Sequence, residues 1–298
     1  MKVAPHVFAE VGKDIMGRSR ELPEVVSNKR RWRSLFGASP LVCSVLWGLI
    51  DPPNNRALPR NADFKHLMWG LVFLRDYNVE ENHSLLTGVD EKTHRKWQWL
   101  FADEIAMAEY KVILWENRPI DDILNDALTS VDGTDCKIPN YKPFWKGWYS
   151  HKFNHAGVRW EVAICLRTGE VVWIHGPFPC GRWPDILVFR HALISHLDAD
   201  EKAEADDGYI GEPGKTLTPK LNTQNESNAE YRQYTRNRQE TINRRFKDWK
   251  CLAKPLRHDL QKHSTMLRAV AVICQVSVTN GEPLFQIDYD QDNFSLPF

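Results

Sequence analysis

The stretch from Leu128 to Thr134 most constrains the fold of this chain, because its polar and apolar residues alternate with the period of a β-strand. A period of two places Ser130, Asp132 and Thr134 on one face of the strand and Val131 on the other. Carboxylate oxygens are the ligands that hard divalent cations take in proteins. The stretch therefore predicts a strand that carries a candidate metal ligand, Asp132.

The residues after this strand predict a loop, a hairpin, a helix, a short strand and a long helix, in that order. Asp135 is expected in the loop, as an acceptor for backbone amides. Residues 160–176 are two apolar runs around a Thr-Gly turn, which is typical of a β-hairpin. Asp185 follows a proline at a helix start, where Asp is a preferred cap. The short strand ends near Asp206, and the long helix carries Glu240.

This order of elements is that of an RNase H-like core, so the predicted fold class is α/β, with a mixed five-stranded sheet and flanking helices. In such a core the fourth strand pairs with the first, which would place Asp206 beside Asp132. Asp207 competes for the same role, because the block is Asp206-Asp207-Gly208-Tyr209. Adjacent strand residues point to opposite faces, so only one of the two reaches the site, and we prefer Asp206.

The long helix around Glu240 is strongly basic. Cations and an amide lie three, four and seven residues from Glu240 and share its face of the helix. Such a row is either an ion-pair ladder at the surface or a track for phosphates, because Lys and Arg give sequence-independent affinity for a nucleic-acid backbone. The predicted DNA contacts of this helix are Arg236, Asn243, Arg244, Arg245 and Lys247.

We interpret Asp132, Asp206 and Glu240 as one metal-binding and catalytic triad for two Mg²⁺ or Mn²⁺ ions, with DNA phosphodiesters as the substrate. One or two carboxylates per ion leave coordination positions open for phosphate and water. In sites of this kind, one ion activates a water or a 3′-hydroxyl, and the other stabilises the leaving oxygen.

Composition excludes few classes of function. The 39 basic and 39 acidic residues give a formal net charge of 0, so global charge predicts affinity for neither nucleic acid nor membrane. The six cysteines include no Cys-x-x-Cys pair, which favours reduced thiols inside a cell. The apolar stretch at residues 40–50 is too short to span a bilayer, and no secretory signal is visible. We therefore expect a soluble protein without a membrane partner.

Residues 1–120 predict a helical N-terminal region, and residues 121–298 an endonuclease-type α/β domain. A short helix, a Gly88 turn and a second helix from Glu91 give residues 61–117 the layout of a helix-turn-helix, whose second helix enters the DNA major groove. An ordinary helical hairpin has the same pattern, with Trp97 and Phe101 in its core. The predicted DNA contacts here are Thr93, His94, Arg95 and Lys96.

Three blocks together resemble the Harbinger/PIF-like branch of DDE transposases, which share a DDE superfamily endonuclease domain. They are Asp132-Gly133-Thr134, Asp206-Asp207-Gly208-Tyr209, and the helix segment from Glu240 to Lys247. The resemblance implies excision of an element from double-stranded DNA at its terminal repeats and insertion elsewhere. It also implies a homodimer or larger assembly, a Myb-like accessory protein and a nuclear location.

Two alternatives remain open at this stage. A domesticated descendant would bind DNA or a partner protein without cutting, although an intact triad favours activity. A structure-specific nuclease on the same fold would act outside transposition, although the helix-turn-helix pattern counts against it.

Overall fold

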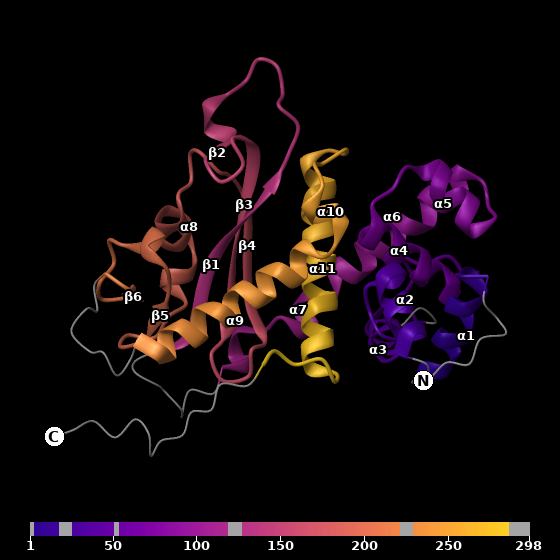
Figure 1. Ribbon diagram of the computed structural model, residues 1–298, viewed down its shortest axis with the longest axis horizontal. Helices are drawn as coiled ribbons and strands as arrows, with labels where there is room; N and C mark the ends of the chain where they lie inside the picture. Colours follow the sequence, from indigo (N-terminus) through magenta and orange to yellow (C-terminus); the bar gives the residue numbers. More distant parts are fainter. Residues whose placement is uncertain (1–2, 18–25, 51–53, 119–126, 221–228, 286–298) are drawn as a thin grey trace. The chain divides into compact units, whose positions relative to one another are not determined.

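The computed structural model describes residues 3–17, 26–50, 54–118, 127–220 and 229–285, and the chain forms two compact units (Figure 1). Unit 1 consists of Met1–Ile113 and Arg245–Glu282, and unit 2 of Leu114–Arg244 and Pro283–Phe298. The predicted division between residues 120 and 121 lies outside the described residues and stays a prediction.

The described elements of unit 1 are all helices. Aspartate side chains cap three of the helices. Asp63 caps α4 by accepting from the backbone amide of Phe64. Asp90 caps α6 and Asp259 caps α11, and each accepts from the backbone amide three residues further along the chain. Helices α4 and α11 both pack on α6. The helices are α1 (Pro5–Ile15), α2 (Val26–Phe36), α3 (Pro40–Ile50), α4 (Phe64–Asp76), α5 (Glu80–Thr87), α6 (Glu91–Met107), α7 (Glu109–Val112), α10 (Lys250–Ala253) and α11 (Leu260–Thr279), together with the part of α9 (Ala229–Lys247) from Arg245 onward.

One described segment, Arg30–Ile50, has the length and composition of a membrane-crossing helix. In the structure this segment is divided between α2 and α3 by Gly37, whose φ of 71° ends the first helix. A helix of eleven residues such as α3 is only about 16 Å long, against about 30 Å for the hydrocarbon core of a bilayer. Val42, Leu46 and Ile50 of α3 are buried inside unit 1. The segment is therefore a pair of core helices of unit 1.

Unit 2 is built on a mixed sheet, which confirms the predicted sheet type. Strand β3 is antiparallel to both β1 and β4, whereas β5 is parallel to β1 and β6 is parallel to β5. The order β4-β3-β1-β5-β6 is consistent with an RNase H-like core, with a two-residue strand, β2, added at β3. The strands are β1 (Ala127–Lys137), β2 (Tyr149–Ser150), β3 (His155–Cys165), β4 (Val171–Pro179), β5 (Lys202–Glu204) and β6 (Thr216–Leu217).

Two helices flank this sheet. Phe189 of α8 (Asp185–His191) packs with Val131 of β1 and Ala163 of β3 in one apolar core. Helix α9 lies against β3, because Gln239 donates to the carbonyl of Val162 at 3.1 Å. Val131 and Asp132 are neighbours on a strand, so they point to opposite faces. Asp132 consequently extends from the face opposite the α8 core.

Candidate active site

Asp132 lies in the middle of β1, opposite Val162 of β3. Its two carboxylate oxygens are held separately. Oδ1 accepts from the backbone amide of Gly133 at 2.7 Å, and Oδ2 accepts from Nδ2 of Asn243 at 2.7 Å. Asn243 belongs to α9, so the strand and the helix together fix the orientation of this half-buried carboxylate. The side chain of Asn243, which is a predicted DNA contact, thus donates a hydrogen bond to Asp132 in the structure.

Asp206 reaches the same region because β5 runs parallel to β1, with Glu204 opposite Ser130. Two residues beyond Glu204, Asp206 caps the 3₁₀-helix η5 (Asp207–Tyr209), and its Oδ1 accepts from the amide of Gly208 at 2.8 Å. This turn, rather than an extended strand, separates the directions of Asp206 and Asp207.

Asp207 contacts Lys220. Its Oδ2 lies 3.4 Å from Nζ of Lys220, and its Oδ1 accepts from the Lys220 amide at 3.3 Å. Of the two neighbouring acids, Asp206 is the one whose charge acts on Asp132.

The pKa of Asp132 reflects the charges of neighbouring carboxylates. Burial, followed by the negative charges of Asp206 and Asp185, raises the pKa of Asp132 from 3.8 to about 7, and Lys152 opposes the shift only weakly. Like charges that share a desolvated region disfavour ionisation. A cation bound among them would reverse that effect, so the region is electrostatically suited to a cation.

Glu240 is exposed on α9 and lies three residues before Asn243. Residues three apart are neighbours on one side of a helix. Because Asn243 contacts Asp132, Glu240 projects from the adjoining turn on that side. Its role as the third member of the triad stays a prediction.

Asp185 is a site carboxylate that the sequence interpretation missed. It is the first residue of α8, where Pro184 is the cap residue, and its side chain makes no capping hydrogen bond. The predicted cap role is therefore wrong. Instead Oδ1 of Asp185 lies 3.2 Å from Nη1 of Arg159, and burial together with the charge of Asp206 raises its pKa, although Arg159 opposes that rise.

Asp135 also differs from its predicted role, because β1 continues to Lys137 and includes it. The side chain is 2% exposed and accepts from Arg159 twice, at 2.8 and 3.2 Å, and from Oγ of Ser150 at 2.7 Å. These bonds hold the pKa of Asp135 below its ordinary value despite its burial. Asp135 is thus an internal anchor for Arg159, and its predicted position in a loop is wrong.

Two buried groups lie beneath these acids. Tyr209 is fully buried, and its hydroxyl has no hydrogen-bond partner among the described residues, while the charges of Glu161, Asp185, Asp132 and Asp206 help burial to raise its pKa. Glu161 is also fully buried. Its Oε2 accepts from Nε1 of Trp173 at 3.1 Å, and burial raises its pKa to about 8. Neither side chain was singled out from the sequence.

The predicted DNA contacts on α6 have different surroundings. His94 is completely buried and packs near Trp69, so its predicted contact with DNA is wrong. Thr93 bonds the capping Asp90, and Arg95 pairs with Glu80 of α5 while remaining exposed. Lys96 is exposed. Helix α5, Gly88 in the left-handed region and α6 do follow one another as predicted.

The basic residues of α9 also divide into classes. Arg244 is exposed, and Arg236 donates to the side chain of Gln233 at 3.2 Å. Arg245 donates to the carbonyl of Glu282 at 2.6 Å, so its guanidinium serves the fold of unit 1. Lys247 is half-buried and helps to lower the pKa of His263. Contact with DNA stays a prediction for each of them.

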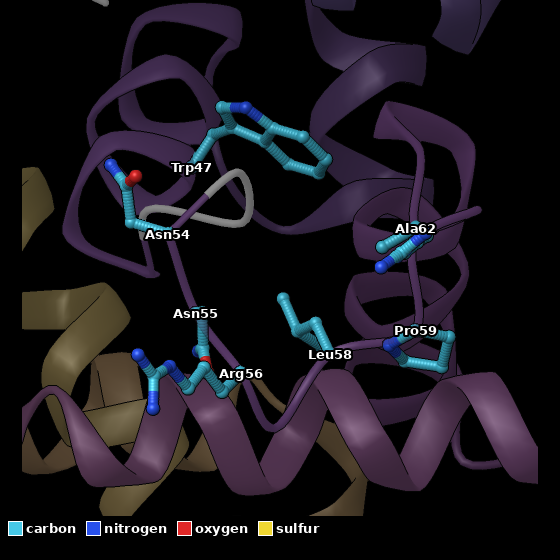
Figure 2. A pocket seen from close by; sticks show the side chains of 8 residues that line it. Trp47, Asn54, Asn55, Arg56, Leu58, Pro59 and Ala62 are labelled. Atoms are coloured by element: carbon cyan, nitrogen blue, oxygen red, sulfur yellow. The ribbon is translucent and has the colours of Figure 1, made fainter.

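A cavity of about 570 Å³ lies elsewhere, in unit 1, between Trp47 and the segment with Asn55 and Leu58 (Figure 2). None of the described residues that line it is acidic. Asn55 donates within the fold to Oε2 of Glu104 at 2.5 Å. The chemistry of the carboxylates therefore lies outside this cavity.

Residues 131–275 match the family model of the DDE superfamily endonuclease. The match supports a DDE-type transposase family and includes Asp132, Asp206 and Glu240. The Harbinger/PIF-like branch stays a prediction. No curated protein and no solved structure shows a significant match to the chain.

Endonucleases of the DDE superfamily generally use divalent metal ions such as Mg²⁺. Within the described ranges, no three His, Cys, Asp or Glu side chains converge closely enough to hold one ion. Mg²⁺ is usually held by one or two carboxylates, with water and substrate phosphate completing its octahedron. Asp132 and Asp206, brought together by parallel strands and mutually repelling, fit that donor set.

Proposed function

We propose that unit 2 is a metal-dependent DNA endonuclease that cuts phosphodiester bonds at transposon ends and joins them to target DNA. The observation that carries the proposal is the electrostatic coupling of Asp206 to Asp132 across the β5 and β1 strands, within the region that matches the DDE superfamily endonuclease. Two carboxylates that repel each other in a desolvated region cost free energy unless a cation binds there.

Asp132, Asp206 and Glu240 would hold two Mg²⁺ or Mn²⁺ ions. When bound, such ions supply an activated water or 3′-hydroxyl nucleophile and stabilise the leaving 3′-oxygen. The chain's own residues prepare the site for them. Asn243 and the Gly133 amide orient the two oxygens of Asp132, and the Gly208 amide orients Asp206. The hydrogen bonds to Asp132 favour the ionised carboxylate that a metal requires.

The exposed arginine Arg244 follows Asn243 on α9 and would contact the phosphate backbone next to the site. Arg236 of α9 and, in unit 1, Lys96 of α6 would also contact a phosphate backbone. Double-stranded DNA is then the substrate. A homodimer or larger assembly, a Myb-like accessory protein and a nuclear location belong to this proposal as well, since paired cleavage of two DNA ends requires two active sites.

The test is cleavage of supercoiled plasmid by the purified full chain in Mg²⁺ or Mn²⁺. We expect wild type to nick the plasmid, and Asp132→Ala, Asp206→Ala and Glu240→Ala each to lower the rate by about 10³-fold or more, since metal stabilisation of the transition state is worth several kcal/mol. Asp207→Ala is the matched control, because Asp207 lies next to Asp206 and points to Lys220. We expect its rate to remain within about twofold of wild type.

The variants also separate the possible roles of Glu240. If Glu240→Ala cuts as fast as wild type while Asp132→Ala is inactive, the third ligand must be sought elsewhere in unit 2. If wild type binds DNA and cuts neither plasmid nor specific DNA ends with either metal, the domesticated DNA-binding role replaces this proposal.

A further inference from the structure

The side chain of Asp185 lies against two glycines, one in the Asp132-Gly133 motif and one in the Asp207-Gly208 motif. A Cβ at Gly133 would stand 2.0 Å from Oδ1 of Asp185, and a Cβ at Gly208 would stand 3.0 Å from Oδ2 of the same residue. Neither glycine has a positive φ, so neither is required by backbone conformation. Each glycine instead leaves room for one oxygen of Asp185.

One small space beside Gly208 is bordered by oxygens of two acids. The point where a Cβ of Gly208 would stand is 2.8 Å from Oδ1 of Asp206 and 3.0 Å from Oδ2 of Asp185. Asp132 extends from the opposite face of β1, and the charges of Asp206 and Asp185 both act on it.

Arg159 fixes Asp185 without cancelling its charge. The guanidinium makes two bonds to the buried Asp135, a third to the carbonyl of Trp183 at 3.2 Å, and a single ion pair with Asp185. One positive charge therefore faces two carboxylates. The three side chains together are negative when both carboxylates are ionised, and Asp185 remains able to attract a cation.

A second observation points to the same space. The hydroxyl of Tyr209 is buried and has no hydrogen-bond partner among the described residues, and the charges of Asp185 and Asp206 are among those that act on it. A phenol oxygen can accept as well as donate, and buried hydroxyls normally have a partner. The hydroxyl of Tyr209 is thus a polar group that the bonds within the described fold leave unused.

We propose that Asp185 is a fourth cation-binding carboxylate of the site, acting beside Asp206 from the α8 face of the sheet. The proposal rests on the proposed endonuclease function and adds a ligand to its metal site. Phe189, fully buried in the core with Val131, fixes α8 against the sheet, which gives Asp185 a rigid mount.

The test measures Mn²⁺ affinity of the full chain by the electron paramagnetic resonance of free Mn²⁺, with the melting temperature in EDTA as a second readout. Asp185→Asn keeps the shape of the side chain and an acceptor for Arg159 but removes the charge. We expect it to weaken Mn²⁺ binding about 10–100-fold, while the metal-free melting temperature is unchanged or rises because repulsion with Asp206 is relieved. The matched control, Asp207→Asn, is expected to keep the wild-type affinity within about twofold.

If the ion pair of Asp185 with Arg159 only stabilised the fold, Asp185→Asn would keep its Mn²⁺ affinity and lose thermal stability. Wild-type Mn²⁺ affinity with a lowered melting temperature in Asp185→Asn would overturn the inference and leave the endonuclease proposal standing, provided that Asp132→Asn still loses binding. Wild-type protein that binds no Mn²⁺, or Asp132→Asn that binds as wild type, would overturn both.

Gly133→Ala tests the geometry independently, because its Cβ would displace Oδ1 of Asp185. We expect reduced Mn²⁺ affinity in the single variant, and no further loss when Gly133→Ala is added to Asp185→Asn, since residues that act through one contact are not additive. Full wild-type affinity in Gly133→Ala, or strict additivity of the two changes, would contradict the inference.

Discussion

Unit 1 and unit 2 both bury titratable side chains, but the neighbours of those side chains differ. Those of unit 1 include histidines among aromatic rings. His66 stacks on Trp97 with ring centroids 3.7 Å apart, and burial lowers the pKa of His66 and of His94 to about 4. Those of unit 2 include carboxylates whose charges act on one another, and the pKa of Asp132 rises to about 7.

The difference shows which kind of burial indicates chemistry. A neutral histidine in an aromatic core contributes to packing and needs no ligand. Carboxylates that share a partly accessible region store repulsion, which only a proton or a cation relieves. A shifted pKa alone therefore does not identify a site, whereas the sign of the neighbouring charges does.

The largest expected effect concerns the histidine side of this comparison. His94→Lys would place a permanent charge at a completely buried position, so we expect the free energy of unfolding to fall by about 3–5 kcal/mol. His94→Gln is the matched control, because it keeps a neutral polar side chain and should cost clearly less. Urea denaturation measures both, and equal costs would show that charge is not the relevant property of this position.

The pH dependence of stability should have opposite signs in the two units. His66 and His94 of unit 1 have folded pKa values near 4, below their unfolded value of 6.5, so unit 1 loses stability as pH falls from about 6.5 toward 4. Asp132 and Glu161 have folded values near 7 and 8, so metal-free unit 2 loses stability as pH rises from about 4 to 8.

We expect changes of about 1–3 kcal/mol in each direction. Hydrogen exchange read by mass spectrometry at pH 5.5 and 7.5 in EDTA, corrected for intrinsic rates, separates α6 from β1. If exchange in α6 and in β1 changed in the same direction between the two pH values, the expected difference between the units would be contradicted.

Asp132→Asn sharpens the carboxylate side. At pH 8 in EDTA the variant should be more stable than wild type by about 1–2 kcal/mol, because the neutral amide removes repulsion with Asp206 and Asp185. Mg²⁺ at about 100 times its dissociation constant should stabilise wild type by about 2.7 kcal/mol and the variant much less. Thermal unfolding with and without Mg²⁺ provides the measurement, and equal stabilisation of both proteins would place the ion elsewhere.

The smallest expected effect is that of Asp207→Ala. Asp207 is 39% exposed and pairs with the 72% exposed Lys220, so its removal should change the free energy of unfolding by less than about 0.5 kcal/mol. Chemical denaturation of Asp207→Ala beside Asp206→Ala gives the comparison. A large loss only at Asp207 would reverse the assignment of these two neighbours.

Much of unit 2 could be predicted from the sequence, because alternation, turn residues and helical spacing are local. The pairing of β5 with β1 followed from the order of elements. Asp185 could not be found in the same way, since a Pro-Asp helix start looks like a cap until the position of Arg159 is known. The available signal for Asp185 was the glycine that follows an aspartate in two motifs, at Gly133 and Gly208. The sequence alone does not show whether such a glycine provides backbone flexibility or room for a neighbouring side chain.

The errors in unit 1 and at Asp135 have equally specific reasons. His94 lies three residues before Trp97 and seven before Phe101, so it is on the same buried face of α6. Its position on the helix, rather than its polarity, determines that it is buried. Asp135 was assigned to a loop because a charged residue rarely continues a buried strand. Arg159, from the neighbouring strand, makes that burial possible.

The composition of unit 1 has a consequence for synthesis of the chain. Helix α6 packs on α11, but residues 1–113 leave the ribosome before Arg245–Glu282 have been made. At about 5–20 residues per second, the N-terminal helices wait several seconds or more with the apolar surface of α6 uncovered. A chain shortened to the end of the strands and α9 would never cover that surface. Chaperone binding should therefore concentrate on nascent α4 and α6 and end when α11 emerges.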